Sequence, residues 1–285
     1  MQLSDFRFHE RLRVRWSEID AQQIVFNGHY LTYFDTGIAG YWRALAVPYA
    51  DTMESLGGDM FVRKATLDYR GSARYDDVLD IAVRCARVGT SSMLFEGGAF
   101  RQGELLVGCE LTYVFADPRL KKPLPVPAEL RALFDDFEAG RTMVDVRVGT
   151  WAELGAAARP IRDQVFIAEQ RISADMEWDD ADADAVHAVA FNRLGRALAT
   201  GRMLEHVPGV AKIGRMAVTA ASRHGGVGRA VLDALLDAAR RRGDREAVLH
   251  AQLSAASFYE RAGFVRRGPE FDEAGIGHVE MLRAL

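Results

Sequence analysis

The chain has 285 residues, of which 49% are hydrophobic and 27% charged, a composition typical of a folded protein rather than a disordered or fibrous one. This length exceeds the usual size of one domain, so we expect two domains that each bury their own core. Residues 1–140 carry 16 basic and 20 acidic side chains, and residues 141–285 carry 20 of each. Neither half has the basic excess expected of a nucleic-acid-binding protein.

The first ten residues lack the apolar segment of a signal peptide, and no apolar stretch reaches the length of a membrane span. We therefore expect a cytoplasmic protein with no membrane partner. The two cysteines, Cys85 and Cys109, lie in alternating apolar segments, which predicts reduced, buried thiols. The spacing of Cys and His residues does not indicate a metal site.

The first half is predicted to be an α+β domain. Residues 7–16 alternate as a strand, and residues 28–46 form a helix that is apolar around much of its circumference and is therefore wrapped on several sides. Four further β-like segments follow, separated by short turns. They are residues 59–70, 78–88, 90–101 and 104–116. The expected result is an antiparallel sheet around one central helix.

A proline-rich segment marks the end of this first domain. Four prolines between Pro118 and Pro127 precede a charged helical stretch at residues 128–138, and we place the boundary near Arg141. The predicted domains are thus 1–140 and 141–285. In the second domain the elements expected are strand 144–148, helix 150–171, acidic loop 175–184, strands 186–193, 196–204 and 210–218, helix 226–242, strand 247–251 and a short helix carrying Tyr259.

The segment from Trp16 to Phe34 contains the parts of an acyl hydrolase. Asp20 precedes an apolar turn and a helix that begins near Asn27 or Gly28. The helix N-terminus offers donors to a carbonyl oxygen that gains negative charge, and the carboxylate can attack or activate water. Asp20 can instead cap a turn, and Asn27 can be the N-cap of the helix.

This segment, with the later run from Asp68 to Leu79, resembles the hotdog-fold acyl-CoA thioesterases related to 4-hydroxybenzoyl-CoA thioesterase, over residues 5–138. The resemblance implies that Asp20 is the catalytic carboxylate and that the domain assembles as a homodimer or homotetramer. His29 is either a group that orients the thioester or a helix-terminal histidine. Gln23 stands where the family usually has Gly, Asn27 where it has His or Tyr, and His29 where it has Asn.

The second half contains a pattern typical of a phosphate-binding turn. The run Arg223-His224-Gly225-Gly226-Val227-Gly228-Arg229 follows an apolar strand and opens an amphipathic helix. Backbone N–H groups and the positive end of the helix can bind an anion there, and the glycines allow its close approach. The glycines can also serve only a tight turn.

The order of these elements, with Phe258-Tyr259-Glu260-Arg261-Ala262-Gly263-Phe264, resembles the GNAT acyltransferase superfamily over residues 143–285. The implied fold is an α/β domain with a mixed, mainly antiparallel sheet. Acetyl-CoA or another acyl-CoA is then a substrate, with no tightly bound cofactor, and Tyr259 is the proton donor to the thiolate. The implied CoA contacts are Met216, Ala217 and Val218 for the pantetheine and Arg223, His224, Gly225, Gly226, Val227, Gly228 and Arg229 for the pyrophosphate.

Several residues are candidates for the general base of such a transferase. Glu177 in the acidic loop is the residue we expect, and Asp175, His187, His250 and His278 are alternatives. A solvated loop also accounts for Glu177, Asp179 and Asp180, and His250 can simply be packed. Acidic residues in this loop would favour a cationic amine acceptor.

The predicted function is therefore bifunctional: acyl-CoA hydrolysis by residues 1–140 and acyl transfer from CoA to a small-molecule or peptide amine by residues 141–285. Two alternatives remain open. The first domain can be a non-catalytic module for dimerisation and acyl-CoA binding that regulates the transferase. The second domain can sense acetyl-CoA without transferring its acyl group.

Overall fold

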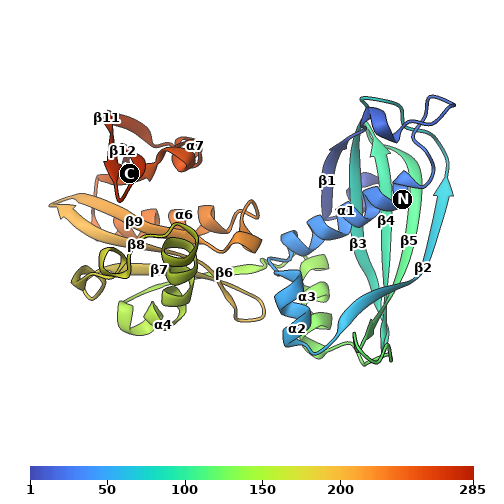
Figure 1. The fold of residues 1–285 in the computed structure, drawn as a ribbon, viewed down its shortest axis with the longest axis horizontal. Helices are drawn as coiled ribbons and strands as arrows, with labels where there is room; N and C mark the ends of the chain where they lie inside the picture. Colours follow the sequence, from blue (N-terminus) through green and yellow to red (C-terminus); the bar gives the residue numbers. More distant parts are fainter. The chain divides into compact units, whose positions relative to one another are not determined.

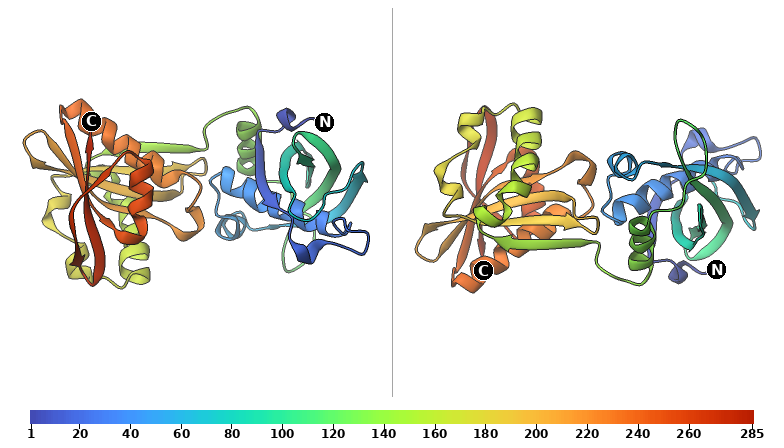
Figure 2. Two further views of the ribbon diagram at one scale, coloured as in Figure 1. Left: turned by 90° about the horizontal axis from the view of Figure 1, so that it is seen from above. Right: turned by 90° about the horizontal axis from the view of Figure 1, so that it is seen from below.

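The computed structural model describes residues 1–285 (Figures 1 and 2), and the chain folds into two compact units, Met1–Met143 and Val144–Leu285. Each unit has its own β-sheet and its own helices. None of the helices combines the length and the apolarity needed to cross a membrane.

The sheet of the first unit has five antiparallel strands in the order β1-β3-β4-β5-β2. β4 lies at its centre, and the edges are β1 and β2. The strands are β1 (Phe8–Arg13), β2 (Asp59–Tyr69), β3 (Val78–Val88), β4 (Ser92–Arg101) and β5 (Glu104–Ala116). The predicted antiparallel sheet is confirmed.

The helix α1 (His29–Ala44) packs closely against this sheet (Figure 1). A methyl group added to Gly37 of α1 would lie 2.9 Å from Ile81 of β3, and one added to Gly97 of β4 would lie 2.9 Å from the Phe34 ring. Glycines on both elements thus allow the close approach. The predicted central helix is confirmed, and its Tyr33 and Phe34 are fully buried.

Two further helices complete the first unit. α3 (Ala128–Glu138), which the sequence predicts, covers the core with Phe134, whose ring packs edge-on against Phe95 of β4. α2 (Tyr49–Ser55) was not predicted, because its seven residues are too few for a helical period to be recognised. Cys85 and Cys109 are buried free thiols as predicted, and burial raises the pKa of each to about 12.

The sheet of the second unit has seven strands in the order β11-β12-β10-β9-β8-β7-β6. The β9–β10 pair is parallel and the other pairs are antiparallel, which confirms the predicted mixed, mainly antiparallel sheet. The strands are β6 (Val144–Gly149), β7 (Val186–Asn192), β8 (Ala197–Val207), β9 (Val210–Val218), β10 (Glu246–Gln252), β11 (Val265–Glu273) and β12 (Ile276–Ala284).

Helices cover both faces of this sheet (Figure 2). α4 (Trp151–Arg162) packs Leu154 and Ala158 against Val189 of β7. On the other face lies α6 (Val227–Arg242), whose Leu235 would be 2.9 Å from a methyl group added to Gly201 of β8. The short helix α7 (Ala256–Arg261) follows β10 and carries Tyr259, as the sequence predicts.

Three expectations for the second unit need correction. The helix predicted over 150–171 ends at Arg162 and continues as a π-helical turn, Asp163–Glu169, which is the kind of local irregularity often found at functional sites. The predicted acidic loop contains the short helix α5 (Ala174–Glu177) and a 3-10 turn, Asp180–Asp182. The hairpin of β11 and β12 was not predicted, because its charged residues hide the alternation typical of a strand.

Candidate active sites

The strands β9 and β10 separate part-way along their length. They pair in parallel only as far as Ile213 and Leu249, whereas β9 runs on to Val218 and β10 to Gln252. Beyond the last pair, the facing edges of the two strands do not hydrogen-bond to each other. This fork leaves backbone N–H and C=O groups available to a ligand that carries its own amides.

A β-bulge reshapes β9 at the fork. Two consecutive residues of β9, Arg215 and Met216, lie opposite the single β8 residue Gly201. Arg215 has a φ of 51°, and its side chain turns toward α5, where its Nε lies 3.1 Å from Glu177 Oε2. Met216 turns the other way, since a methyl group added to Gly201 would lie 2.5 Å from its sulfur. The bulge thus places the Arg215 side chain on the pocket side of the sheet.

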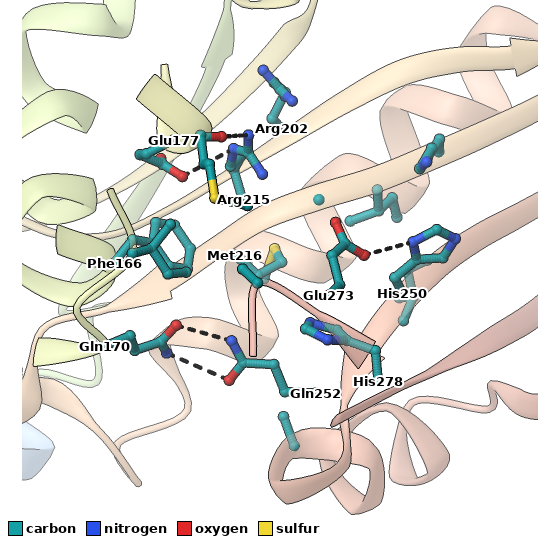
Figure 3. A pocket seen from close by; sticks show the side chains of 18 of the residues that line it. Phe166, Gln170, Glu177, Arg202, Arg215, Met216, His250, Gln252, Glu273 and His278 are labelled. Atoms are coloured by element: carbon teal, nitrogen blue, oxygen red, sulfur yellow. Dashed lines mark hydrogen bonds and ion pairs between the residues drawn. The ribbon is translucent and has the colours of Figure 1, made fainter. Parts of the chain in front are cut away.

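A pocket of about 390 Å³ lies at this fork (Figure 3). This volume is within the range of small-molecule sites. Its walls come from the π-helical turn and α5, from β8, β9 and β10, and from α7 and the β11–β12 hairpin. Among the lining residues are Phe166, Gln170, Glu177, Arg215, Met216, His250, Gln252, Tyr259, Glu273 and His278. Of the residues predicted from the sequence, Met216, Glu177 and Tyr259 line this pocket, and Ala217 and Val218 do not.

Glu177 is buried, with 2% of its surface exposed, and it accepts a hydrogen bond from Arg162 at 2.5 Å. Arg162 is itself only 1% exposed and also donates to Asp182 at 2.8 Å. Arg202 of β8 bonds both Asp182 and Asp179. We call the six residues Arg162, Glu177, Asp179, Asp182, Arg202 and Arg215 the ion-pair network.

The ion-pair network changes the interpretation of the acidic segment. Burial raises the pKa of Glu177, and the ion pairs with Arg162 and Arg215 oppose that shift. The Arg202 guanidinium lowers the pKa of Asp179, and hydrogen bonds from Arg162 and Arg202 lower that of Asp182 against the effect of its burial. Glu177 and Asp182 are therefore not solvated, whereas Asp175, Asp180 and Asp184 of the same segment are exposed. Arginines neutralise Glu177, Asp179 and Asp182, so these three carboxylates give no basis for expecting a cationic acceptor.

Tyr259 lies in the pocket wall and is 8% exposed. Burial raises the pKa of its phenol to about 12, so the hydroxyl keeps its proton at neutral pH. Nearby, Gln170 and Gln252 exchange two amide hydrogen bonds, of 2.9 and 3.4 Å, across the pocket (Figure 3). These amides link the end of β10 to the residue after the π-helical turn.

The three candidate histidines of this unit lie in different surroundings. His187 is 1% exposed, its Nε2 lies 2.9 Å from the Asp182 carbonyl oxygen, and burial lowers its pKa. It packs in the core against Trp151 and does not line the pocket, which makes it a poor base. His250 and His278 both line the pocket, and His250 Nδ1 is 3.1 Å from a carboxylate oxygen of Glu273. The other alternative, Asp175, is absent from the pocket wall.

The glycine-containing turn from Arg223 to Arg229 opens α6, and Gly226 is its N-cap with a φ of 78°. His224, Gly225 and Gly226 are exposed, and His224 also has a positive φ of 66°. The side chains of Arg223 and Arg229 bond Glu169 and Asp233, respectively. The turn does not line the 390 Å³ pocket, so the predicted pyrophosphate contacts stay a prediction.

In the first unit, Asp20 lies in a tight turn that ends at Ile24. The backbone N–H of Gln22 donates to Asp20 Oδ1 at 2.8 Å, and the N–H of Asp20 donates to the Ile24 carbonyl at 2.9 Å. Gln23 has a φ of 63°, a conformation that glycine adopts most easily, at the position where the resembling thioesterases usually have Gly. Asp20 thus has the turn-capping contact expected from its residue type.

Glu18, which sequence reasoning did not identify, links this turn to α1. Glu18 is 3% exposed and accepts hydrogen bonds of 2.7 Å from the Arg15 N–H and the Tyr33 hydroxyl. Burial alone would raise its pKa, but these bonds and the Arg15 guanidinium outweigh burial and lower it. Glu18 therefore fixes the segment that carries Asp20.

The prediction that Asn27 caps the central helix is wrong. The N-cap of α1 is Gly28, without a side-chain cap, and Asn27 instead offers its carbonyl oxygen to the Tyr69 hydroxyl at 3.0 Å. His29 is the first residue of α1, and its ring meets the Phe26 ring edge-on. A pocket of this unit lies elsewhere, beside α2, and includes neither Asp20 nor His29.

Comparison with known proteins assigns the second unit. A family model described as acetyltransferase (GNAT) domain matches residues 163–285. An uncharacterized N-acetyltransferase of Bacillus subtilis, YjcF, is 32% identical over 43% of this chain and 87% of its own length. The chain belongs to the GNAT acetyltransferase family. A solved acyl-CoA N-acyltransferase from Pseudomonas aeruginosa is 31% identical, with a TM-score of 0.45 over 50% of this chain and 99% of that one.

The first unit matches a different family. A model described as thioesterase superfamily covers residues 22–107, which include His29 but begin after Asp20. The acyl-CoA thioesterase YbgC of Haemophilus influenzae is 26% identical over 46% of this chain and 96% of its own length. The chain is thus a fusion of a hotdog thioesterase-type domain and a GNAT domain.

Proposed function

We propose that the chain acts on CoA thioesters twice: residues 1–140 hydrolyse acyl-CoA, and residues 141–285 transfer an acyl group from CoA to an amine. Acyl-CoA is then a substrate of both domains, and no tightly bound cofactor is needed. The observation that carries the transferase proposal is the fork between β9 and β10, which opens onto a pocket that contains Tyr259.

In the transferase, the pantetheine amides would pair with the free edge of β9 beyond Ile213, where Met216 lines the pocket. The amine attacks the thioester carbonyl, the C–N bond forms and the C–S bond breaks. Tyr259 gives its proton to the departing sulfur, and the phenol carries that proton at neutral pH. The turn from Arg223 to Arg229 would bind the diphosphate at the start of α6.

In the hydrolase, Asp20 would attack the thioester carbonyl or activate water, and the first N–H groups of α1 would polarise the carbonyl oxygen. His29, the first residue of α1, would orient the thioester at that helix end. Four exposed aromatic side chains of this unit support an assembly of two or four copies, a homodimer or homotetramer, because large apolar side chains at a surface are often covered by a partner. These side chains are Trp16, Phe26, Tyr69 and Tyr75.

A second candidate function for residues 1–140 is a non-catalytic module that binds acyl-CoA and mediates dimerisation. The contact between Asp20 and the Gln22 N–H supports it, because this contact occupies one oxygen of the carboxylate. Either activity places the protein where CoA thioesters occur, and we propose the cytoplasm.

One assay separates these functions. Free thiol is measured over a panel of short, long and aromatic acyl-CoAs, with and without a mixture of amines. We expect amine-independent release that Asp20→Asn abolishes, and amine-dependent release that Asp20→Asn leaves in place. Absence of amine-independent release with every acyl-CoA would favour the non-catalytic module, and absence of amine-dependent release would refute the transferase.

A further inference from the structure

His250, Glu273 and His278 come together on one wall of the pocket (Figure 3). His250 belongs to β10, Glu273 ends β11 and His278 lies near the start of β12. The three strands are neighbours in the sheet, and paired residues on adjacent strands share a face. His278 pairs with Gln252 across β10 and β12 and with Phe271 across β11 and β12, so all three residues lie on the face that carries the pocket.

His250 stands next to the fork. Leu249 is the last residue of β10 that pairs with β9, and His250 is the next residue along the strand. A thioester held along the free edge of β9 would therefore end close to this side chain. The imidazole is partly accessible, with 32% of its side chain exposed, so an incoming substrate can reach it.

The contact with Glu273 orients the imidazole. Because a carboxylate only accepts hydrogen bonds, the 3.1 Å contact requires the proton on Nδ1 of His250, and the lone pair of the neutral ring is then on Nε2. The negative charge of Glu273 also stabilises the imidazolium that forms when Nε2 takes a proton. The Phe271 ring packs edge-on against His250 and limits its rotation.

The other candidates for a base are less suited. Glu177 lies between Arg162 and Arg215, whose charges hold its carboxylate in the ion-pair network. His278 lines the pocket, but its Nδ1 faces the carbonyl oxygen of Ile276 at 2.8 Å, so it has no negative partner to stabilise a second proton. His250 alone combines a place at the fork, access and a carboxylate partner.

We propose that His250 is the general base of the acyl transfer and that Glu273 is its positioning residue. This inference rests on the transferase function proposed above. As the amine nitrogen bonds to the acyl carbon, its proton passes to His250 Nε2; as the C–S bond breaks, the proton of Tyr259 passes to the sulfur. The proton on His250 then leaves to solvent and the phenolate is reprotonated, so the products are an amide and free CoA.

The test uses the full chain with acetyl-CoA and the amine mixture, and the acetylated amine is identified by mass spectrometry. For His250→Gln we expect a loss of about a hundredfold or more in amine-dependent kcat/KM, the usual size of a general-base contribution, with unchanged acetyl-CoA affinity by calorimetry. For Glu273→Gln we expect a smaller loss that falls on kcat and leaves the amine KM unchanged, because the imidazole loses the carboxylate that orients it while the pocket keeps its lining.

The other charged or titratable groups around His250 are Glu280 and His278 on β12 and Lys212 on β9, and all are unchanged in these variants. His9→Gln, on β1 of the first unit, is the matched histidine control, because His9 also lies beside a carboxylate, that of Asp80, and the variant should keep the wild-type rate. Wild-type kcat/KM in His250→Gln, or wild-type kcat in Glu273→Gln, would overturn this proposal alone. A wild type that binds acetyl-CoA but acetylates no amine would overturn the transferase function as well.

Discussion

At the scale of single residues, the same side-chain type has different chemistry in different surroundings. Glu177 and Glu273 both line the pocket, but the first is held by two arginines and the second by one imidazole. His187 and His250 both belong to strands, but only His250 is accessible from the pocket. The sequence identified all of these residues except Glu273 as candidates for the base, and it had no means of ranking them because their partners come from distant segments.

Tyr259 offers the most direct test at this scale. Tyr259→Phe removes the proton that the thiolate needs but keeps the ring, so we expect a loss of about a hundredfold in amine-dependent thiol release. Acetyl-CoA affinity, measured by calorimetry, should stay within a factor of two because the pocket keeps its shape. Full activity in this variant would mean that another group or water protonates the sulfur.

At the scale of elements, the bounds of strands were predicted well, and the irregularities within elements were not. The predicted bounds of β3 and β5 agree with the structure at both ends, because their apolar residues alternate. The π-helical turn after Arg162 looks like ordinary helix in the sequence, and the bulge at Arg215 looks like ordinary strand. Both irregularities line the pocket, so the parts that shape the site were those with the weakest local signal.

The bulge explains a packing requirement at Gly201. In Gly201→Ala the new methyl would lie 2.5 Å from Met216 Sδ and 2.9 Å from Leu235 Cδ1, so β8 and β9 must shift. We expect the free energy of unfolding to fall by about 1–3 kcal/mol, as for other overpacked sites. Gly214→Ala is the matched control, because no atom would lie within 4 Å of its added methyl. Chemical denaturation should therefore separate the two variants, and equal stability would contradict this packing.

The ion-pair network gives a second prediction for the elements around the pocket. Arg162→Met leaves the buried carboxylates of Glu177 and Asp182 with fewer partners, which should lower the free energy of unfolding by about 3–5 kcal/mol. Arg240→Met removes an exposed ion pair on α6 and should change stability little. An equal effect of both substitutions in urea denaturation would show that burial adds nothing to this network.

The same network makes stability depend on pH. The pKa of Asp182 is lower in the folded chain than in the unfolded one, so its contribution is complete above the unfolded value of about 4. That contribution is lost as the pH falls through the lower, folded value. We expect the free energy of unfolding to decrease between pH 5 and pH 3, less steeply in Asp182→Asn. A parallel decrease in both proteins would exclude Asp182 as the cause.

At the scale of the whole molecule, the chain consists of two units with complete sheets and separate cores. The sequence predicted both folds, because each half carries a long ordered series of motifs and the elements appear in the expected order. The particular pairing of β9 with β10, and the point where it stops, follows from the three-dimensional arrangement and is not encoded in any single segment.

Two separate cores predict independent folding. Fragments 1–143 and 144–285, expressed separately, should each show a cooperative thermal transition by circular dichroism at the temperature found for the corresponding step in the full chain. A fragment that stays unfolded on its own would show that its core depends on the other half. The fragment 144–285 should also retain acetyl-CoA binding, since the fork and its pocket lie entirely within it.

The paired amides of Gln170 and Gln252 bear on how a substrate enters the fork. Each glutamine has one donor and one acceptor engaged with the other, and each amide keeps one further N–H and one further lone pair. A substrate arm with two amide groups of its own has the same number of donors and acceptors to exchange. Entry then exchanges these hydrogen-bond partners one for one without leaving a polar group unsatisfied, so separating the two glutamines carries little energetic penalty.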